Sequence, residues 1–302
     1  GVYMRDPTFP KEPAANGDPA VGTVAEFDEA DQDSQQRRAE MHWGGEIRDA
    51  IAQGRIHLAC QPIVATGTDR VVGFELLLRL RDEHGVVHPD TQALISAAEV
   101  YGLATEVDLH VTELALQQLA ARLPQLSDLE FVSINLSGQS LGRSGFAERI
   151  LELIAQSRVP ASKLCFEITE TATISNLERA IEFVRQLRSR GCRVAIDDFG
   201  SGLASFHYLK SLPCDLVKID GAFVRDMLND RASLDLVTAI DGIAKLLGVR
   251  TVAEFVETEQ IDQAVCRLGI DYRQGARFPL APDLDTALDQ LAGSAQGRQI
   301  DR

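Results

Sequence analysis

The chain has 302 residues, of which 45% are hydrophobic and 25% are charged, and its formal net charge at pH 7 is -15. This length and composition suffice for one large hydrophobic core or two smaller ones, and they exclude a disordered protein. The negative charge, with no basic stripe to displace phosphate counterions, argues against binding to a nucleic-acid polymer. An anionic ligand would therefore need metal ions or a few placed basic groups.

The apolar runs and the spacing of cysteines and histidines limit the membrane contacts and metal sites that the chain could have. No apolar run approaches the roughly 20 residues that span a bilayer, and no basic-then-apolar leader is present, so we expect a soluble segment without direct membrane contact. The five cysteines are never spaced as C-x-x-C, which favours free thiols in a reducing cytoplasm. The histidines also lack a close ligand spacing. Any metal is therefore expected to have oxygen ligands, which favours Mg2+ or Mn2+.

The amino-terminal third begins with a segment of low regularity. Residues 1–35 are rich in Pro, Gly, Ala and Asp and are expected to form a linker or tail. From about Gln36 to Gln53, apolar residues recur at helical intervals and predict an amphipathic packing helix. The runs His57–Val64 and Arg70–Leu80 then predict two strands of a β-hairpin.

After the hairpin, helical and strand-like segments alternate. Further strands are expected at 131–134, 164–166, 194–196, 216–217, 251–253 and 270–272. Helices are expected at 91–101, 105–122, 146–155, 177–190, 223–247 and 284–291. This order favours the α/β class and a TIM-like (β/α)8 barrel over residues 36–295, with a tail at 296–302. An open doubly wound sheet is the rival, but no G-x-G-x-x-G turn follows the first strand.

The most informative stretch lies at the end of one predicted strand. Asp197 and Asp198 follow the apolar run Val194–Ile196 and precede a glycine-flanked turn. Neighbouring carboxylates repel each other and resist desolvation, so the pair needs a cation or a hydrogen-bond network. A divalent metal site and an Asp-rich turn that caps the next helix explain these two residues equally well.

The same arrangement recurs along the chain, because most predicted strands end at a polar or charged residue. Barrel active sites lie at the carboxyl ends of the strands, so these residues would surround one mouth. The residues are Glu75, Asn135, Glu167, Asp197, Asp198, Lys218, Glu254 and Gln274. Strand ends also tolerate polar residues without any function, but the recurrence in nearly every repeat favours a functional site.

The second strand of the hairpin carries an acid and a base on one face. Because successive side chains of a strand point to opposite faces, Glu75, Leu77 and Arg79 share a face, and Leu76 lies on the other. On these residues alone, a structural ion pair between Glu75 and Arg79 is the simpler interpretation.

Taken together, the motifs resemble those of the EAL domain family, phosphodiesterases that hydrolyse the bacterial second messenger cyclic di-GMP. The resemblance covers about residues 36–300 and keeps the order of the family's motifs. These are Gln61-Pro62-Ile63, Phe74-Glu75-Leu76-Leu77-Leu78-Arg79, Asn135-Leu136-Ser137, Glu167-Ile168-Thr169-Glu170, Asp197-Asp198-Phe199-Gly200-Ser201-Gly202, Lys218-Ile219-Asp220, Ala253-Glu254-Phe255-Val256-Glu257-Thr258 and Gln274-Gly275.

The resemblance implies a role for each matching residue. Glu75, Asn135, Glu167 and Asp197 would hold one metal ion, and Asp197, Asp198 and Glu254 would surround a second. Lys218 would orient or help to activate the attacking water, so that Glu75, Lys218, Asp198 and Glu254 form the implied catalytic set. Ligand contacts are implied for Gln61, Leu77, Arg79, Asn135, Asp220, Phe255, Gln274 and Pro282. Glu170 and Glu257 would anchor the loop after Asp198, whose order is coupled to homodimerisation in the family.

The chain departs from the family's pattern at several positions. Leu76 replaces the alanine of Glu-Ala-Leu, and since it faces away from Glu75 we expect a packing change toward the helical layer. Phe255 replaces a glycine, and its ring would stack on a guanine or, alternatively, fill space over the strand end. Ala276 and the segment 280–282 lack an aromatic and a basic residue common in the family, which would affect affinity more than chemistry.

Two functional hypotheses remain. The first is a metal-dependent phosphodiesterase that converts cyclic di-GMP to linear pGpG, and it is supported by the complete set of implied ligands. The second is a weak or inactive cyclic di-GMP receptor that signals through a protein partner, and it is supported by the altered signature and rim. Residues 1–6 and 36–43 also resemble the junction after a GGDEF diguanylate cyclase domain, so we expect a tandem protein, whose upstream segments could tether it to a membrane.

Overall fold

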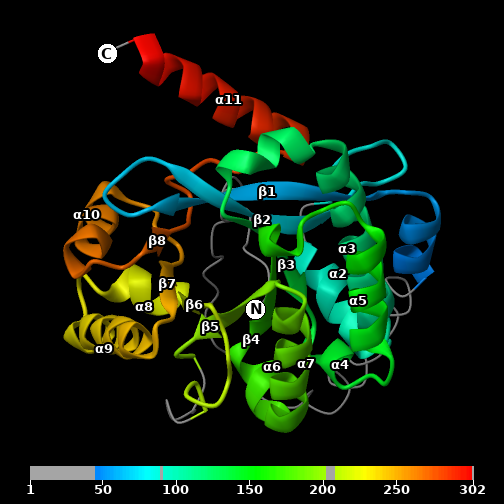
Figure 1. Cartoon of the computed structure of the whole chain (residues 1–302), viewed down its shortest axis with the longest axis horizontal. Helices are drawn as coiled ribbons and strands as arrows, with labels where there is room; N and C mark the ends of the chain where they lie inside the picture. Colours follow the sequence, from blue (N-terminus) through cyan, green and yellow to red (C-terminus); the bar gives the residue numbers. More distant parts are fainter. Residues whose placement is uncertain (1–44, 89–90, 202–207, 301–302) are drawn as a thin grey trace, which may run out of the picture.

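The computed structural model describes residues 45–88, 91–201 and 208–300, and these form a closed eight-stranded barrel surrounded by helices (Figure 1). The strands are β1 (Ile56–Ala65), β2 (Val71–Leu80), β3 (Phe131–Leu136), β4 (Leu164–Thr169), β5 (Arg193–Phe199), β6 (Leu216–Ile219), β7 (Arg250–Ala253) and β8 (Tyr272–Arg273). A helix over residues 45–52 precedes β1. The later helices are α2 (Thr91–Val100), α3 (Ala104–Ala121), α4 (Gly138–Leu141), α5 (Phe146–Gln156), α6 (Glu170–Ser175), α7 (Leu177–Ser189), α8 (Gly221–Asp226), α9 (Arg231–Leu247), α10 (Glu259–Leu268) and α11 (Leu284–Ile300). The 3-10 helices η1 (Leu123–Asp128) and η2 (Ala161–Lys163) lead into β3 and β4.

The barrel confirms the predicted TIM-like α/β fold, but its first strand runs in the opposite direction to the others. β1 pairs antiparallel with β2 and β8, whereas the pairs from β2 round to β8 are parallel. The expected hairpin is also confirmed, because Ile56 lies opposite Leu80. β1 therefore begins at the end of the barrel where β2 finishes.

Two apolar clusters hold the barrel and its helices together. Inside the barrel, toward the amino ends of the parallel strands, lie Ile63, Val72, Phe131, Cys165, Ala195, Leu216, Val252 and Tyr272. The outward-facing strand residues Leu76, Phe166 and Ile196 belong to the larger cluster, which packs against the helices. Since Leu76 is 1% exposed in that layer, the expected packing role of this residue is confirmed. The carboxyl half of the interior contains most of the buried polar side chains, among them Glu75, Asn135 and Glu167.

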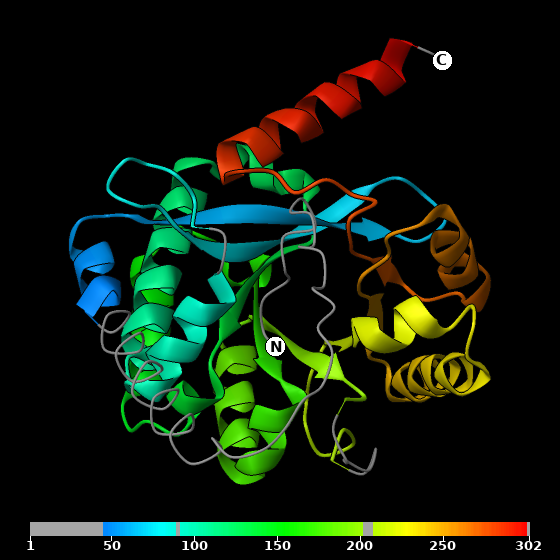
Figure 2. The same ribbon diagram turned by 180° about the vertical axis from the view of Figure 1, so that it is seen from behind.

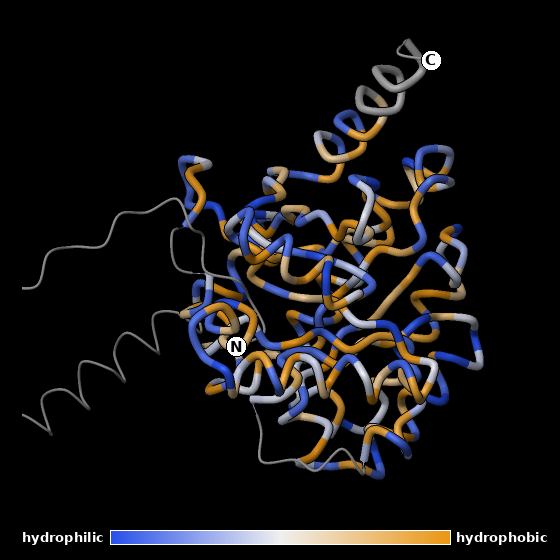
Figure 3. The backbone as a smooth tube through the Cα atoms, turned by 90° about the vertical axis from the view of Figure 1, so that its left-hand side faces the viewer, coloured by the Kyte–Doolittle hydropathy of each residue, from blue (hydrophilic) through white to orange (hydrophobic). Residues whose placement is uncertain are grey.

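The longer helices pack against the barrel through their apolar residues. In α10, for example, the buried residues Ile261, Ala264 and Val265 follow the three-and-four spacing of an amphipathic helix. Figure 3 shows the resulting alternation of apolar and polar residues along the helical parts of the chain. Figures 1 and 2 show α11 leaving the barrel beside β1.

Several boundaries differ from those expected. α11 continues to Ile300 instead of ending near Leu291, so the expected tail overlaps its last turns. The expected linker at residues 1–35, and the part of the first helix before residue 45, lie outside the described residues. Within the described ranges, no helix is both long enough and apolar enough to cross a bilayer.

A local irregularity in β5 matters for the site. Ile196 pairs with Val217 of the neighbouring strand β6, and Phe199 pairs with Ile219. Two residues of β5 therefore lie between these pairs, where β6 has one. Asp198 is one of the two β5 residues, and it has a left-handed φ of 53°, a conformation that Asp tolerates better than most residues. Such a β-bulge re-aims side chains, and it brings the carboxylates of adjacent residues together where regular pleating would separate them.

Candidate active site

The centre of the site is the buried ammonium group of Lys218, on β6. Its Nζ lies 2.7 Å from Glu167 Oε2 and 3.0 Å from Glu75 Oε2, and it donates hydrogen bonds to both. Two further carboxylate oxygens lie within ion-pair distance, Asp197 Oδ1 at 3.0 Å and Glu254 Oε1 at 2.9 Å. We call these five residues the Lys218 cluster: Lys218, Glu75, Glu167, Asp197 and Glu254.

These side chains converge because their strands are in register. Glu75 lies opposite Ser133, and two residues further along, Asn135 lies opposite Glu167. The sequence predicts a strand that stops at each polar residue, but Asn135, Glu167 and Asp197 lie within their strands, which extend one or two residues beyond them. Their side chains therefore point into the barrel and do not project from loops.

Glu75 has two more partners in the interior. Asn135 Nδ2 donates to Glu75 Oε1 at 2.7 Å, and Gln274 Nε2 donates to Oε2 of the same carboxylate. Gly275 follows with φ +154°, and a Cβ there would overlap the backbone of Val256, so only glycine fits this approach. Glu75 is thus paired with Lys218 and the two amides, and not with Arg79 as in the structural ion pair considered from the sequence.

Excess negative charge dominates the electrostatics of the Lys218 cluster. Burial, followed by repulsion from Glu75, raises the pKa of Glu167 to about 8. Burial also raises the pKa of Asp197 to about 6 and moves the pKa of Glu254 well above its ordinary value. For Lys218, burial alone would lower the pKa, but the surrounding carboxylates, Asp197 first, hold it well above its ordinary value. One ammonium does not neutralise four carboxylates, so the cluster favours additional positive charge.

A group of three carboxylates beside this centre can hold a metal ion. One oxygen from each of Asp197, Asp198 and Glu254 lies within 4.8 Å of the others, and two of the three residues are buried. Among the described residues, Asn135 Oδ1 and Gln274 Oε1 are buried without a hydrogen-bond partner. Asp197 Oδ1 is close to Lys218 but accepts no hydrogen bond from it. Carboxylate and amide oxygens with spare lone pairs fit a hard divalent cation.

The candidate ligand-contacting residues of β1 and β2 lie in the same half of the barrel. Gln61 pairs with Glu75 in the register, and its amide donates to the carbonyls of Gly275 (3.2 Å) and Phe278 (2.7 Å). Leu77 is fully buried. Arg79 is 6% exposed and donates to the carbonyl of Leu78 at 2.8 Å. The hairpin therefore contributes to both the carboxylate centre and its rim.

The other candidate contacts are less enclosed. Asp220 is half-buried and caps α8, since its carboxylate accepts a hydrogen bond from the amide of Ala222 at 2.8 Å. Pro282 is exposed and follows Ala281, which pairs with Cys60 of β1. Phe255 is half-buried and packs against α8. Asp220 thus has a structural role in addition to the implied contact.

Glu170 lies at the start of α6 and holds both sides of the segment that follows β5. Its carboxylate accepts hydrogen bonds from the Gly200 amide (2.8 Å) and from the Tyr208 hydroxyl (3.1 Å). Tyr208 was not found from the sequence, because it lies 38 residues from Glu170 and no motif contains it. Glu257, the second implied anchor, is exposed in the connection between β7 and α10.

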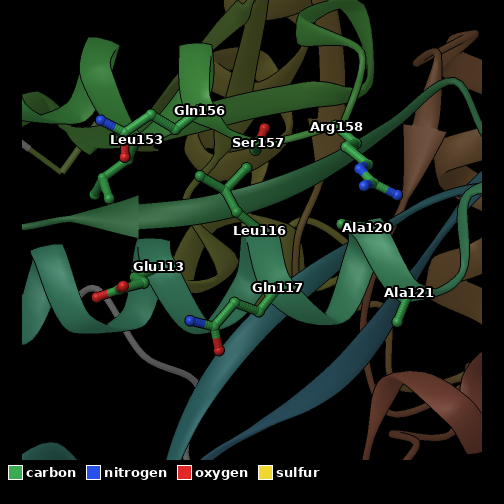
Figure 4. A pocket seen from close by; sticks show the side chains of 9 residues that line it. All are labelled: Glu113, Leu116, Gln117, Ala120, Ala121, Leu153, Gln156, Ser157 and Arg158. Atoms are coloured by element: carbon green, nitrogen blue, oxygen red, sulfur yellow. The ribbon is translucent and has the colours of Figure 1, made fainter.

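A separate hollow lies on the outside of the barrel, between α3 and α5 (Figure 4). It is lined by Glu113, Leu116, Gln117, Ala120, Ala121, Leu153, Gln156, Ser157 and Arg158. None of the predicted site residues is among them, so the hollow is not part of the centre.

Known proteins resemble this chain over most of its length. The cyclic di-GMP phosphodiesterase PdeB of Shewanella oneidensis is 38% identical over 250 residues, which cover 82% of this chain and 29% of that protein. The cyclic di-GMP phosphodiesterase PdeF of Escherichia coli is 34% identical over 268 residues, which cover 84% of this chain and 35% of that protein. The chain thus spans about a third of the length of these relatives.

A solved structure and a family model agree with this result. The structure described as the PaMucR phosphodiesterase in complex with c-di-GMP superposes with a TM-score of 0.72 at 28% identity, covering 78% of this chain and 95% of that one. The model of the EAL domain matches residues 45–279, which contain the Lys218 cluster and its partners. The chain therefore belongs to the EAL domain family.

Proposed function

We propose that this domain is a metal-dependent phosphodiesterase that hydrolyses cyclic di-GMP to linear pGpG. In this reaction, water attacks one phosphorus and one phosphoester bond to a ribose oxygen breaks. The hydroxyl group of the water stays on the new phosphate, and its remaining proton goes to the freed ribose oxygen. The observation that carries the proposal is the Asp197, Asp198 and Glu254 group beside the Lys218 cluster. The names of the relatives support the choice of substrate.

The oxygen donors favour Mg2+ or Mn2+, and we propose two ions. Asp197, Asp198 and Glu254 would hold one, and Glu75, Asn135, Glu167 and Asp197 would hold the other. Bound ions would lower the pKa of water and neutralise charge on the phosphoryl oxygens.

Lys218 has a distinct part in this proposal. Its raised pKa keeps it an ammonium, so it acts as a hydrogen-bond donor and not as a base. It holds Glu75 and Glu167 in place and can donate to an attacking water or a phosphate oxygen. Arg79, with its planar fork of donors, would bind a phosphate of the dinucleotide at the rim.

A receptor without turnover is the second candidate, and one observation favours it. Lys218 already contacts four carboxylates, and three of them, Glu75, Glu167 and Asp197, belong to one proposed metal set, so the centre has a cation of its own. Such a domain would bind cyclic di-GMP without a metal and pass a signal to a protein partner.

One experiment separates the two candidates. The purified chain is incubated with cyclic di-GMP and Mn2+, or with EDTA, and the nucleotides are separated by chromatography. We expect linear pGpG with Mn2+ only. Intact nucleotide in both samples, with binding established by calorimetry, would instead support the receptor. Family resemblance also leads us to propose a homodimer in the cytoplasm, which sedimentation and fractionation would test.

A further inference from the structure

Phe255, directly after Glu254, has a backbone conformation that is rare for its residue type. Its φ is 51°, in the left-handed region, and in the described part of the chain only Asp198 is another non-glycine residue with positive φ. A Cβ makes this region costly, and a bulky side chain there needs compensating contacts. The family's glycine at this position, noted from the sequence, would take the same conformation without that cost.

The contacts of the ring supply the compensation. Phe255 lies so close to Gly221 that a Cβ at position 221 would overlap the ring. The guanidinium of Arg225, one helical turn further along α8, lies over the same ring at 4.4 Å from its centroid. Gly221 and Arg225 thus form a seat for this aromatic side chain, which combines close packing with a cation–π contact.

The backbone around Phe255 connects two neighbouring strands. The Glu254 amide donates to the carbonyl of Ile219 on the β6 side at 3.4 Å. The Val256 amide donates to the carbonyl of Gln274 on the β8 side at 2.9 Å. Phe255 is the single residue between these two anchors, so its conformation sets the direction in which the chain leaves Glu254.

We propose that the Phe255 ring, seated on Gly221 and Arg225, is a positioning device that fixes Glu254 toward Asp197 and Asp198. Phe255 is then a positioning residue and not a base-stacking contact, which favours the space-filling alternative noted from the sequence. The inference deepens the proposed function, because it rests on that carboxylate group as a metal site. Outer residues that orient metal ligands typically change metal affinity by about 10- to 100-fold when they are altered.

The test measures Mn2+ affinity by calorimetry and, separately, kcat and KM for cyclic di-GMP. We expect Phe255→Ala to weaken Mn2+ binding by about tenfold and to lower kcat with little change in KM. Phe255→Tyr, which keeps the ring, should restore both. Gly242→Ala is a matched control, because a Cβ at this position of α9 has nothing within 4 Å.

A double-mutant cycle makes the assignment specific. Gly221→Ala should weaken Mn2+ binding by about tenfold when Phe255 is present, because the new methyl group displaces the ring. In the Phe255→Gly background the same change should alter the affinity less than twofold. If Phe255→Ala does not fold, this pair of measurements still decides the matter.

Two outcomes would overturn the proposal. An unchanged Mn2+ affinity with a raised KM would make the ring a substrate contact, and equal effects of Gly221→Ala in both backgrounds would show that the seat does not act through Phe255. Failure of the proposed function would look different. The Phe255 variants would still bind Mn2+ more weakly than the unaltered domain, but the unaltered domain would not hydrolyse cyclic di-GMP.

Discussion

Lys218 Nζ lies 2.7 Å from Glu167 Oε2, and this is the shortest of the four contacts that the ammonium makes with carboxylates. Both side chains are almost fully buried, so neither charge can be relieved by water. Removal of one member of such a group therefore changes the electrostatics of the others.

Glu75→Gln tests the carboxylate that is shared by Lys218, Asn135 and Gln274. We expect hydrolysis of cyclic di-GMP to fall by at least about 100-fold, since a neutral amide is a weaker metal ligand and loses the ion pair with Lys218. The measurement is the initial rate with saturating Mn2+. Thermal unfolding serves as the control, and a variant that folds normally but keeps more than a tenth of the rate would contradict the assigned role.

Lys218→Met removes the ammonium and leaves four buried carboxylates facing one another. Loss of one partner from a buried ion pair typically costs about 3–5 kcal/mol, so we expect a marked fall in Tm in the presence of EDTA. Mn2+ should raise the Tm of this variant more than that of the unaltered protein, because the ion supplies the missing charge. An equal shift in both proteins would argue against a metal ion next to Lys218.

Glu170→Ala should disturb the segment after β5. Its carboxylate holds the Gly200 amide and the Tyr208 hydroxyl, so its loss frees both sides of the segment next to Asp198. We expect a fall of about tenfold or more in Mn2+ affinity, measured by calorimetry.

Tyr208→Phe is the matched, milder variant, because it removes one hydrogen bond of about 0.5–1.5 kcal/mol and keeps the ring. If Tyr208→Phe lowered the Mn2+ affinity as much as Glu170→Ala, the effect of Glu170 would come from its bond to Tyr208 alone. The bond to the Gly200 amide would then contribute nothing.

Metal affinity should increase with pH between about 6 and 8. Glu167, with a pKa of about 8, and Asp197, with a pKa of about 6, are raised by burial, and metal ions bind the deprotonated carboxylates. Protons therefore compete with the metal at the lower pH, and the competition at these two carboxylates ends as the pH rises past their pKa values. Calorimetry with Mn2+ at pH 6, 7 and 8 measures the effect. In Glu167→Gln we expect weaker binding and a flatter pH dependence, whereas a flat profile in the unaltered protein would contradict this account.

The larger features of the fold and site follow from local patterns in the sequence. The hairpin of β1 and β2, the barrel and the inward face of Glu75 could be predicted because alternation along a strand and the strand-helix order are local properties. The convergence of the polar strand residues also follows, because parallel strands present equivalent ends to one side of a barrel.

What could not be predicted depends on backbone detail. Regular alternation would place Asp197 and Asp198 on opposite faces, and only the bulge and the left-handed φ of Asp198 bring their carboxylates together. The seat of Phe255 on Gly221 joins residues from different strand-helix repeats, and no sequence period links them. The approach of Lys218 to four carboxylates likewise requires the closed barrel.

The reversed direction of β1 decides where the polypeptide enters this domain. Ile56 lies opposite Leu80, at the end of the barrel that holds the Lys218 cluster, so the helix at residues 45–52 leads into β1 at that end. In a barrel of parallel strands it would arrive at the far end. The side chain of Arg55, just before β1, donates a hydrogen bond to the carbonyl of Arg81, just after β2, at 3.1 Å. β1 pairs with β2 from Ile56 to Val64, so this entry is joined by a backbone hydrogen-bond ladder to the strand that carries Glu75.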